Sequence, residues 1–263
     1  MSYQSIVIET DGPVGILTLN RGDRHNAFDE TLIEEITRGL DQLEADPAVR
    51  VVVLSSVGKS FCAGADLNWM KRAAGYSPEE NLADAHNLAE MLRTLNELKK
   101  PTVARVQGPA YGGGVGLVAA CDVAIATFDA QFALTEVKLG ILPAIISPYV
   151  IGKIGERYAR RYFLTAERFA ASEAYRIGLV HEIVPDDAGL DEAVGEIIDA
   201  LLKNGPNAMA AAKGLIAAVA GRPIDAALID DTAQRITRQR ASDEGREGIT
   251  AFLEKRKPGW LSE

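Results

Sequence analysis

The pattern of hydrophobic and polar positions changes along the chain, from alternating strand and helix signals to helix signals alone. Two short apolar runs, at 6–8 and 16–19, flank the turn residues 11–13, which predicts a β-hairpin. Between about residues 29 and 45 the apolar positions recur at helical spacing, and an Asp or Thr near the start can cap the helix. The unbroken apolar run 51–54 is typical of a strand buried on both faces of a parallel sheet.

The same alternation continues through the middle of the chain. The pattern predicts a long helix at 78–98, a strand at 102–106, a glycine-rich apolar helix after it, and strands at 123–126 and 131–133. Strands and helices that alternate in this way indicate an α/β fold.

Helical spacing dominates after about residue 148. The predicted helices lie at 154–164, 172–177, 190–203, 206–220, 224–240 and 242–254, and only 181–184 has an extended pattern. We therefore expect two units, a core over residues 1–200 and a helical C-terminal region over residues 201–263.

The composition is that of an ordinary globular protein, with 47% hydrophobic and 25% charged residues among 263. The formal net charge is -9 and the basic residues are scattered, which argues against nucleic acid as a partner. The only two cysteines are Cys62 and Cys121, and a chain of this size needs no disulfide, which favours a reduced, cytoplasmic compartment. The first residues lack the pattern of a signal peptide, and no apolar run is long enough to span a membrane.

Two turns rich in small residues follow two of the predicted strands. Residues 61–67 follow the strand at 51–54, and residues 108–114, which end in three glycines, follow the strand at 102–106. The first N–H groups of a helix have no partner inside that helix, and small residues let a ligand approach them. Two such turns side by side would form an oxyanion hole, although a triple glycine more often serves close packing.

Other glycine-rich sites fit these residues less well. No Gly-Lys-Ser or Gly-Lys-Thr follows, so the turn is not a phosphate loop. The dinucleotide spacing Gly-x-Gly-x-x-Gly is also missing. The histidines His25, His86 and His181 are not spaced as a metal site, and Cys62 has no histidine near it in the motif, so we interpret this cysteine as a packing residue.

Several motifs together resemble the crotonase (enoyl-CoA hydratase/isomerase) family. They are Leu19-Asn20-Arg21 with Asn26-Ala27, Phe61-Cys62-Ala63-Gly64-Ala65-Asp66-Leu67, Gly112-Gly113-Gly114, Cys121-Asp122, Gln131-Phe132-Ala133 with Glu136, and residues 244–256. The resemblance covers nearly the whole chain, in order and at the spacing of the family. It implies a ββα-spiral core and a helical C-terminal trimerisation region, in a homotrimer or a dimer of trimers.

The resemblance also implies an acyl-CoA substrate, with coenzyme A as part of the substrate and no separate cofactor or metal. It assigns the oxyanion hole to the N–H groups of Ala65 and Gly113. The substrate-binding residues that it implies are Arg24, Asn26, Ala27, Ala63, Gly64, Asp66, Leu67, Tyr111, Gly112, Leu142 and Pro143. The basic residues 255–257 would reach the coenzyme A phosphates, or else form a solvated charged end.

Glu136 is the candidate acid–base residue. Its apolar neighbours predict partial burial, which would raise its pKa and suit proton transfer. By resemblance, Glu136 occupies one of two positions that carry catalytic glutamates in hydratases, and the other position holds Gly116. One carboxylate can serve a concerted hydration and suits double-bond isomerisation well. The chain is therefore predicted to be a hydratase, with isomerase as the alternative and a non-catalytic coenzyme A-binding or RNA-binding relative as a further one.

The segment 142–149 is bulkier than the glycine-rich turn usual in family hydratases, which predicts a narrowed or reshaped acyl pocket. Ser147 and Tyr149 would orient a polar group there or simply pack. Residues 65–72, Gly116 and 146–149 resemble the 3-methylglutaconyl-CoA hydratases of leucine breakdown and the carboxygeranoyl-CoA hydratases of terpene breakdown. That resemblance predicts a branched or carboxylated acyl chain. A second carboxylate would need a cation, for which the candidates are Lys71, Arg72 and Lys138, and a surface role is the alternative for each.

Overall fold

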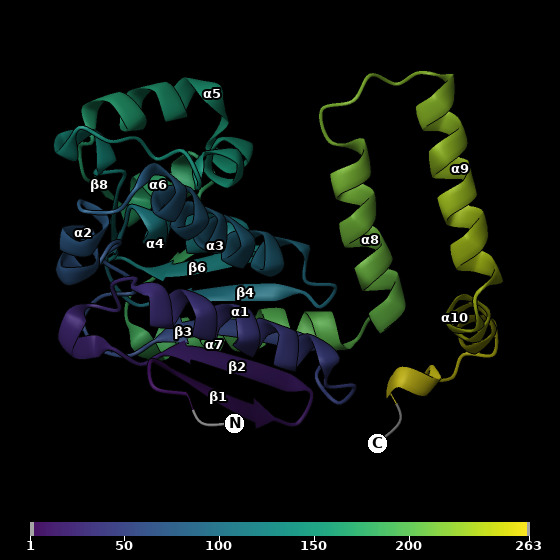
Figure 1. Cartoon of the computed structure of the whole chain (residues 1–263). Helices are drawn as coiled ribbons and strands as arrows, with labels where there is room; N and C mark the ends of the chain where they lie inside the picture. Colours follow the sequence, from purple (N-terminus) through teal and green to yellow (C-terminus); the bar gives the residue numbers. More distant parts are fainter. Residues whose placement is uncertain (1–2, 262–263) are drawn as a thin grey trace.

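The computed structural model describes residues 3–261 and is built on a six-stranded, mostly parallel sheet (Figure 1). The strands lie in the order β1 (Ile6–Asp11), β2 (Val14–Leu19), β3 (Val51–Ser56), β4 (Thr102–Val106), β6 (Val123–Thr127) and β9 (Glu182–Val184). β1 and β2 form the predicted antiparallel hairpin, and each later neighbour is parallel. Met1 and Ser2, on which the signal-peptide prediction partly rests, lie outside the described residues.

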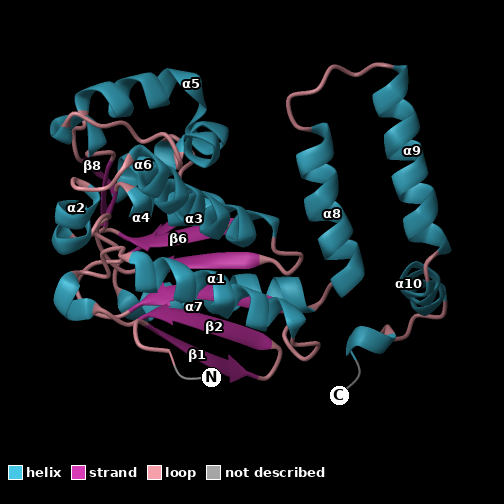
Figure 2. Cartoon of the chain, viewed as in Figure 1, coloured by secondary structure: helices cyan, strands magenta, loops and turns pink. Residues whose placement is uncertain are grey.

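Helices cover both faces of this sheet (Figure 2). The first face packs against α1 (Glu30–Ala45), α3 (Pro78–Glu97) and α4 (Gly113–Ala120), and the second against α7 (Asp187–Leu202). Successive residues of a strand point to opposite faces. Accordingly Val52 and Leu54 belong to the first core, whereas Val51 and Val53 belong to the second. The continuous apolar run of β3 is therefore buried on both sides, as predicted.

The helix starts are fixed by side-chain caps. Asp29 caps α1 by accepting a hydrogen bond from the N–H of Leu32, so Asp29 and not Thr31 is the cap. α3 begins with a capping box between Ser77 and Glu80. These caps satisfy N–H groups that have no partner inside the helix.

The segments beyond the ends of the strands form a second layer around a three-stranded sheet of β5 (Ala110–Tyr111), β7 (Gln131–Ala133) and β8 (Phe169–Ala170). The helices here are α2 (Leu67–Ala73), α5 (Ser147–Thr165) and α6 (Ala171–Arg176), with short 3-10 turns at Gly22–Arg24 and Glu136–Leu139. α5 starts at Ser147, earlier than predicted, because Pro148 is tolerated in a first turn. A break at Gly155 interrupts α5 at the second residue of the predicted range 154–164.

The C-terminal helices lie to one side of the sheet core (Figure 1). They are α8 (Pro206–Val219), α9 (Ala226–Ala241) and α10 (Asp243–Leu253), followed by a 3-10 turn at Gly259–Leu261. Arg50, next to β3, donates to the carbonyls of Asn204 (2.6 Å) and Trp260 (3.2 Å), so it holds both ends of this region. Within residues 3–261, the helices lack the combination of length and apolar character that crossing a bilayer requires.

Candidate active site

The two predicted turns lie side by side and are joined by main-chain hydrogen bonds. The N–H of Tyr111 donates to the carbonyl of Cys62 (2.9 Å), and the N–H of Phe61 donates to the carbonyl of Pro109 (3.0 Å). Cys62 and Ala110 form a parallel bridge. These bonds fix the turn after β3 against the turn after β4, as the oxyanion interpretation requires.

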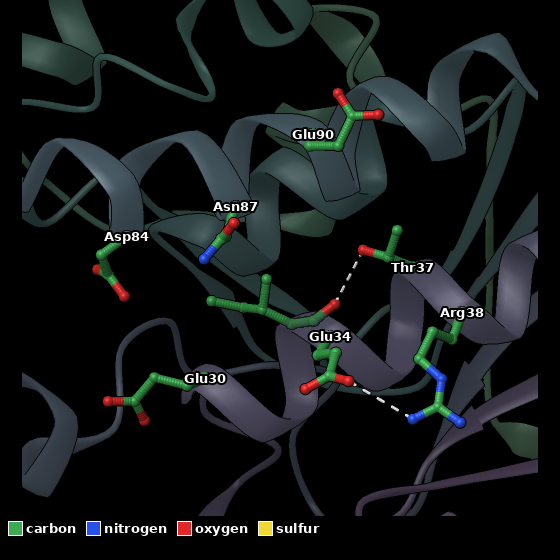
Figure 3. A pocket seen from close by; sticks show the side chains of 8 residues that line it. Glu30, Glu34, Thr37, Arg38, Asp84, Asn87 and Glu90 are labelled. Atoms are coloured by element: carbon green, nitrogen blue, oxygen red, sulfur yellow. Dashed lines mark hydrogen bonds and ion pairs between the residues drawn. The ribbon is translucent and has the colours of Figure 1, made fainter. Parts of the chain in front are cut away.

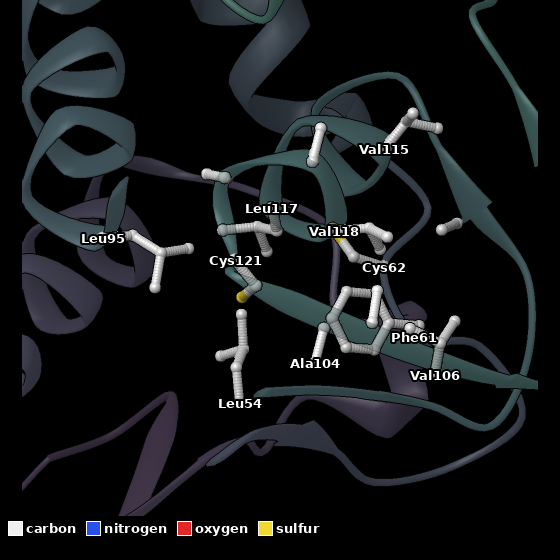
Figure 4. Close-up of a cluster of buried hydrophobic side chains, with 14 of the residues drawn as sticks. Leu54, Phe61, Cys62, Leu95, Ala104, Val106, Val115, Leu117, Val118 and Cys121 are labelled. Atoms are coloured by element: carbon white, nitrogen blue, oxygen red, sulfur yellow. The ribbon is translucent and has the colours of Figure 1, made fainter. Parts of the chain in front are cut away.

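The core beneath the two turns is closely packed and apolar (Figure 4). Leu54 of β3 and Ala104 and Val106 of β4 lie close to the side chains of α4 there. Cys62 and Cys121 are both buried in this core, and burial raises the pKa of each thiol to about 12. The structure therefore supports the interpretation of Cys62 as a packing residue, because a nucleophilic cysteine needs a lowered pKa.

Phe28 fastens the first turn from the other side. Its N–H donates to the carbonyl of Gly64 (2.7 Å), and its carbonyl accepts from the N–H of Asp66 (2.8 Å). Ala65 lies between these two bonds. The ring of Phe28 also lies against the start of α4, where a Cβ on Gly113 would come within 2.5 Å of its Cε2 atom. One aromatic residue thus positions both candidate oxyanion residues.

The N–H groups of Ala65 and Gly113 are available to a ligand. Neither group donates a hydrogen bond to another atom of residues 3–261. Gly113 is the first residue of α4, where the N–H is free and the helix dipole favours negative charge. Gly64 (φ 88) and Gly112 (φ 51), the residues just before them, adopt backbone conformations that other residues rarely take. These two glycines turn the following N–H groups away from the main chain.

The carboxyl group of Glu136 lies next to Gly112, the residue that precedes Gly113. A Cβ on Gly112 would lie 3.2 Å from its Oε1 atom, and its Oε2 atom is buried with no hydrogen-bond partner among the described residues. Burial raises the pKa of this carboxyl above its ordinary value, as the apolar neighbours in the sequence predict. A buried carboxyl oxygen usually has a hydrogen-bond partner, so this oxygen is free to bind a proton, a water molecule or a substrate group.

An apolar cavity of about 330 Å³ brings these groups together. Of the predicted site residues, those that line it are Ala63, Gly64, Ala65, Gly112, Gly113, Glu136, Leu142 and Pro143. The rest of the wall includes Trp69 and Met70 from the 65–72 motif and Ala144, Ile145 and Ile146 from the bulky 142–149 segment. The sequence did not single out the remaining lining residues, which are Phe28, Leu88, Thr135, Leu139 and Ile141. Most of this wall consists of apolar residues from α2, α3 and the 139–146 segment, and only the folded chain brings them to one place.

The other predicted substrate-binding residues lie outside the lining, and several have structural roles. Asn26 is fully buried, and its side chain bonds the N–H of Arg21 and the carbonyls of Val57 and Ser60 at 2.8–2.9 Å. Asp66 accepts from the N–H groups of Asn68 and Trp69 and thereby caps α2. Both side chains therefore shape the turns.

The remaining predicted residues differ in exposure. Arg24 and Leu67 are exposed, whereas Ala27 is buried and accepts a hydrogen bond from Arg21 through its carbonyl. The main chain of Tyr111 lies close to Gly64, because a Cβ added to Gly64 would lie 3.0 Å from the carbonyl oxygen of Tyr111.

The place of the missing second glutamate is filled by hydrocarbon. A Cβ on Gly116 would overlap the Cγ2 atom of Ile146 and lie 3.0 Å from its Cβ atom. Ile146 belongs to the bulky segment that the sequence predicts to reshape the acyl pocket, and it does line the cavity. Ser147 donates to the carbonyl of Ala144 (2.7 Å), and Tyr149 packs on the core. Neither of these two lines the cavity, so the structure favours packing roles for both.

The three candidate cations for an acyl carboxylate do not line the cavity. Arg72 is exposed and pairs with Glu30 of α1 at 2.6 Å. Lys71 and Lys138 are also exposed. In the C-terminal basic run, Arg256 pairs with Glu247 (2.6 Å) and Glu254 (2.8 Å), which satisfies its charge locally.

A second groove, of about 390 Å³ between α1 and α3, has the opposite character (Figure 3). Its described lining includes the acidic residues Glu30, Glu34, Asp84 and Glu90, and Arg38, which also lines it, pairs with Glu34 at 3.5 Å. This acidic wall would repel a phosphate-bearing ligand. Within residues 3–261 no group of His, Cys, Asp and Glu side chains is arranged to hold a metal ion.

Comparisons with known proteins agree over the full length of the chain. A family model described as enoyl-CoA hydratase/isomerase matches residues 9–263. An enoyl-CoA hydratase from Shewanella pealeana is 46% identical with a TM-score of 0.95, and the match covers 98% of this chain and 96% of that one. Pseudomonas aeruginosa AtuE is 38% identical with a TM-score of 0.93, over 98% and 100% of the two chains. The crotonyl-CoA hydratase of Syntrophomonas wolfei is 33% identical over 264 residues, which covers 100% of both.

Proposed function

The chain belongs to the enoyl-CoA hydratase/isomerase family and has the crotonase-type α/β fold that the sequence predicts, and from this premise we propose that it adds water to a 2-enoyl-CoA. One observation carries the proposal. Ala65 and Gly113, whose N–H groups are free, and Glu136, which has an unpartnered carboxyl oxygen, line the same apolar cavity.

In this proposal the two N–H groups bind the thioester carbonyl oxygen. Negative charge grows on that oxygen when a nucleophile adds to the conjugated double bond, so donors fixed in advance stabilise the transition state more than the substrate. The position of Gly113 at the start of α4 adds the positive end of the helix dipole. Each donor of this kind typically contributes about 3–4 kcal/mol.

Glu136 is the proposed acid and base. Its carboxylate takes a proton from a water molecule while the water oxygen bonds to C3 of the acyl chain, and the same proton is then delivered to C2. The raised pKa supports this cycle, because a group that both accepts and donates a proton works best when its pKa lies near the working pH. No other carboxylate lines the cavity, whose lining lies wholly within the described residues.

Of the two acyl classes that the sequence predicts, we propose the branched and uncharged one. The lining offers a wall of Leu, Ile, Trp and Met side chains and no Lys or Arg among its described residues. A second carboxylate in that wall would be left without a partner, which is costly in an apolar site. The coenzyme A part of the bound substrate would extend out of the cavity past Ala63 and Gly64. Arg24 and the basic run 255–257 are the candidate contacts for its phosphates.

Isomerisation is the second candidate, and the single carboxylate in the lining favours it. One base can remove a proton from C2 of a 3-enoyl thioester and return it at C4, which moves the double bond from C3=C4 to C2=C3. The same two N–H groups would stabilise the intermediate enolate.

One absorbance assay separates the candidates. We expect crotonyl-CoA and 3-methylcrotonyl-CoA to lose their enoyl-thioester absorbance when the purified protein is added. The same assay with 3-methylglutaconyl-CoA tests the carboxylated alternative. If 2-enoyl substrates are unchanged while 3-enoyl substrates gain absorbance, the protein is an isomerase and the hydratase proposal is wrong. If neither class reacts, the catalytic proposal fails as a whole.

A further inference from the structure

Ile146 and Gly116 fit together as a pair. The Cγ2 atom of Ile146 lies 2.3 Å from the position that a Cβ on Gly116 would take, which is too close for both atoms, and Leu92 Cδ1 lies 3.6 Å from the same position. Ile146 is only 3% exposed and lines the cavity, whereas Gly116 is buried and does not. The isoleucine side chain therefore stands between α4 and the cavity.

Residue 116 is placed to influence the chemistry of the cavity. It lies three residues after Gly113 in α4, and residues with this spacing share one face of a helix. Gly113 lines the cavity and supplies one of the free N–H groups. A side chain at position 116 would thus point toward the region beside the bound thioester, and Ile146 presents a hydrocarbon surface there instead.

We propose that Ile146, seated on Gly116, is a specificity-determining residue that bounds the acyl site on the side of α4 and selects short, apolar acyl chains. The inference rests on the proposed function for its substrate class, although the contact between the two residues does not. Two consequences follow. Shortening Ile146 should open the site to longer chains, and a side chain can be added at Gly116 only after Ile146 has been shortened.

The first experiment is a double-mutant cycle on thermal stability, which needs no activity. Gly116→Ala should lower the Tm of the wild-type protein, because the new methyl group meets Ile146. In an Ile146→Gly background the same substitution should raise the Tm, because alanine is favoured over glycine inside a helix and the nearest remaining atom is in ordinary contact. A Gly116→Ala shift of the same sign in both backgrounds would overturn the proposed contact.

The second experiment compares kcat/KM for 2-octenoyl-CoA and crotonyl-CoA. Ile146→Ala should raise the ratio of the two values by about tenfold or more, because a few methylene groups in an apolar pocket carry that much discrimination. The matched control is Ile154→Ala, an equal truncation of a buried residue that belongs to α5 but does not line the cavity. This control should lose stability and leave the ratio unchanged. If Ile146→Ala does not fold, Ile146→Val should give a smaller shift in the same direction.

The outcomes separate this inference from the function itself. A wild-type protein that hydrates both substrates, with the same ratio after shortening Ile146, contradicts the inference and leaves the hydratase function intact. An equal change of ratio in Ile154→Ala would also contradict it, because the change would then reflect general loosening of the fold. A wild-type protein with no hydratase activity removes the proposed function, while the stability cycle still tests the contact.

Discussion

Glu136 combines burial with a carboxyl oxygen that has no partner among the described residues, and these features work against its charged form. The folded-state pKa is raised, so the folded protein holds this proton more tightly than the unfolded chain does. Protonated Glu136 therefore contributes to the free energy of unfolding. This contribution is fully present below the ordinary pKa of 4.5 and is lost as the pH rises through the raised pKa of the folded protein. The burial of Glu136 therefore reduces stability at neutral pH, and this cost is typical of a residue with the proposed catalytic role.

Glu136→Gln should lower the hydration rate by about 10²–10⁴-fold, the usual contribution of a general acid or base. The same substitution should raise the Tm at pH about 8 and change it less at pH about 4, because only the charged form is penalised. In the wild type, activity should fall as the pH drops through a pKa above the ordinary glutamate value. Rate measurements and thermal melts across pH test these points, and unchanged activity in Glu136→Gln would remove this residue from the mechanism.

Gly113→Ala should reduce kcat by about 10²–10³-fold, comparable to the loss of one oxyanion donor. The added Cβ would come within 2.5 Å of Phe28, so the ring or the start of α4 must shift and carry the N–H group out of place. Gly152→Ala is the control, because a Cβ at Gly152 in α5 meets nothing within 4 Å. Steady-state rates of both variants decide the point: equal activity would show that the position of this N–H group does not matter.

At the scale of elements, α2 depends on its cap. Asp66 accepts from the N–H groups of Asn68 (2.8 Å) and Trp69 (3.1 Å), and the indole of Trp69 donates to Asp84 of α3 (3.2 Å). Because Trp69 and Met70 form part of the cavity wall, the geometry of this short helix affects the shape of the proposed acyl site.

Asp66→Ala should destabilise the protein by about 1 kcal/mol, the usual effect of losing a helix cap, and should also raise the KM for acyl-CoA. Asp66→Asn should retain most of the cap. Asp225→Ala removes an equivalent cap from α9, far from the cavity in sequence, and should reduce stability without changing the KM. Thermal melts and steady-state kinetics test the pair, and a KM that is equal in the two alanine variants would contradict the role of α2 as a wall.

Sequence patterns predicted the long elements and missed those that depend on distant partners. The two-residue strands β5 and β8 exist only because Phe132 of β7 pairs with Ala110 on one side and with Phe169 on the other. In the candidate site, the family resemblance and not the local patterns predicted that the two turns and Glu136 act together, and residues of all three line one cavity. The sequence analysis names both Gly116 and the segment that contains Ile146. The contact between the two residues could not be predicted, because the local pattern of one segment carries no information about its distance from the other.

At the scale of the whole molecule, the C-terminal helices display apolar side chains. Ile216 (67%), Ile224 (85%), Phe252 (82%) and Leu253 (72%) are largely exposed. Isolated exposed apolar residues are common, but several within α8–α10 and their connections favour contact with another chain. We propose that this region joins copies of the chain, in the trimer or dimer of trimers that the sequence predicts.

The double variant Phe252→Ser/Leu253→Ser should shift the mass in solution toward the monomer, because it removes two apolar contacts from each copy. Leu82→Ser, on α3 and 60% exposed, is the control and should leave the mass unchanged. Sedimentation velocity measures both variants. A wild-type protein that sediments as a monomer would contradict the proposal.

The closely packed core beneath the two turns also determines how slowly the two cysteines react with thiol reagents. With pKa values of about 12, Cys62 and Cys121 are almost wholly protonated at neutral pH, and both are shielded from reagents. Alkylation of the native protein should therefore follow the rate at which the core opens. A cysteine introduced on the surface would then be the one position that accepts a fluorescent label, without replacement of the two natural thiols.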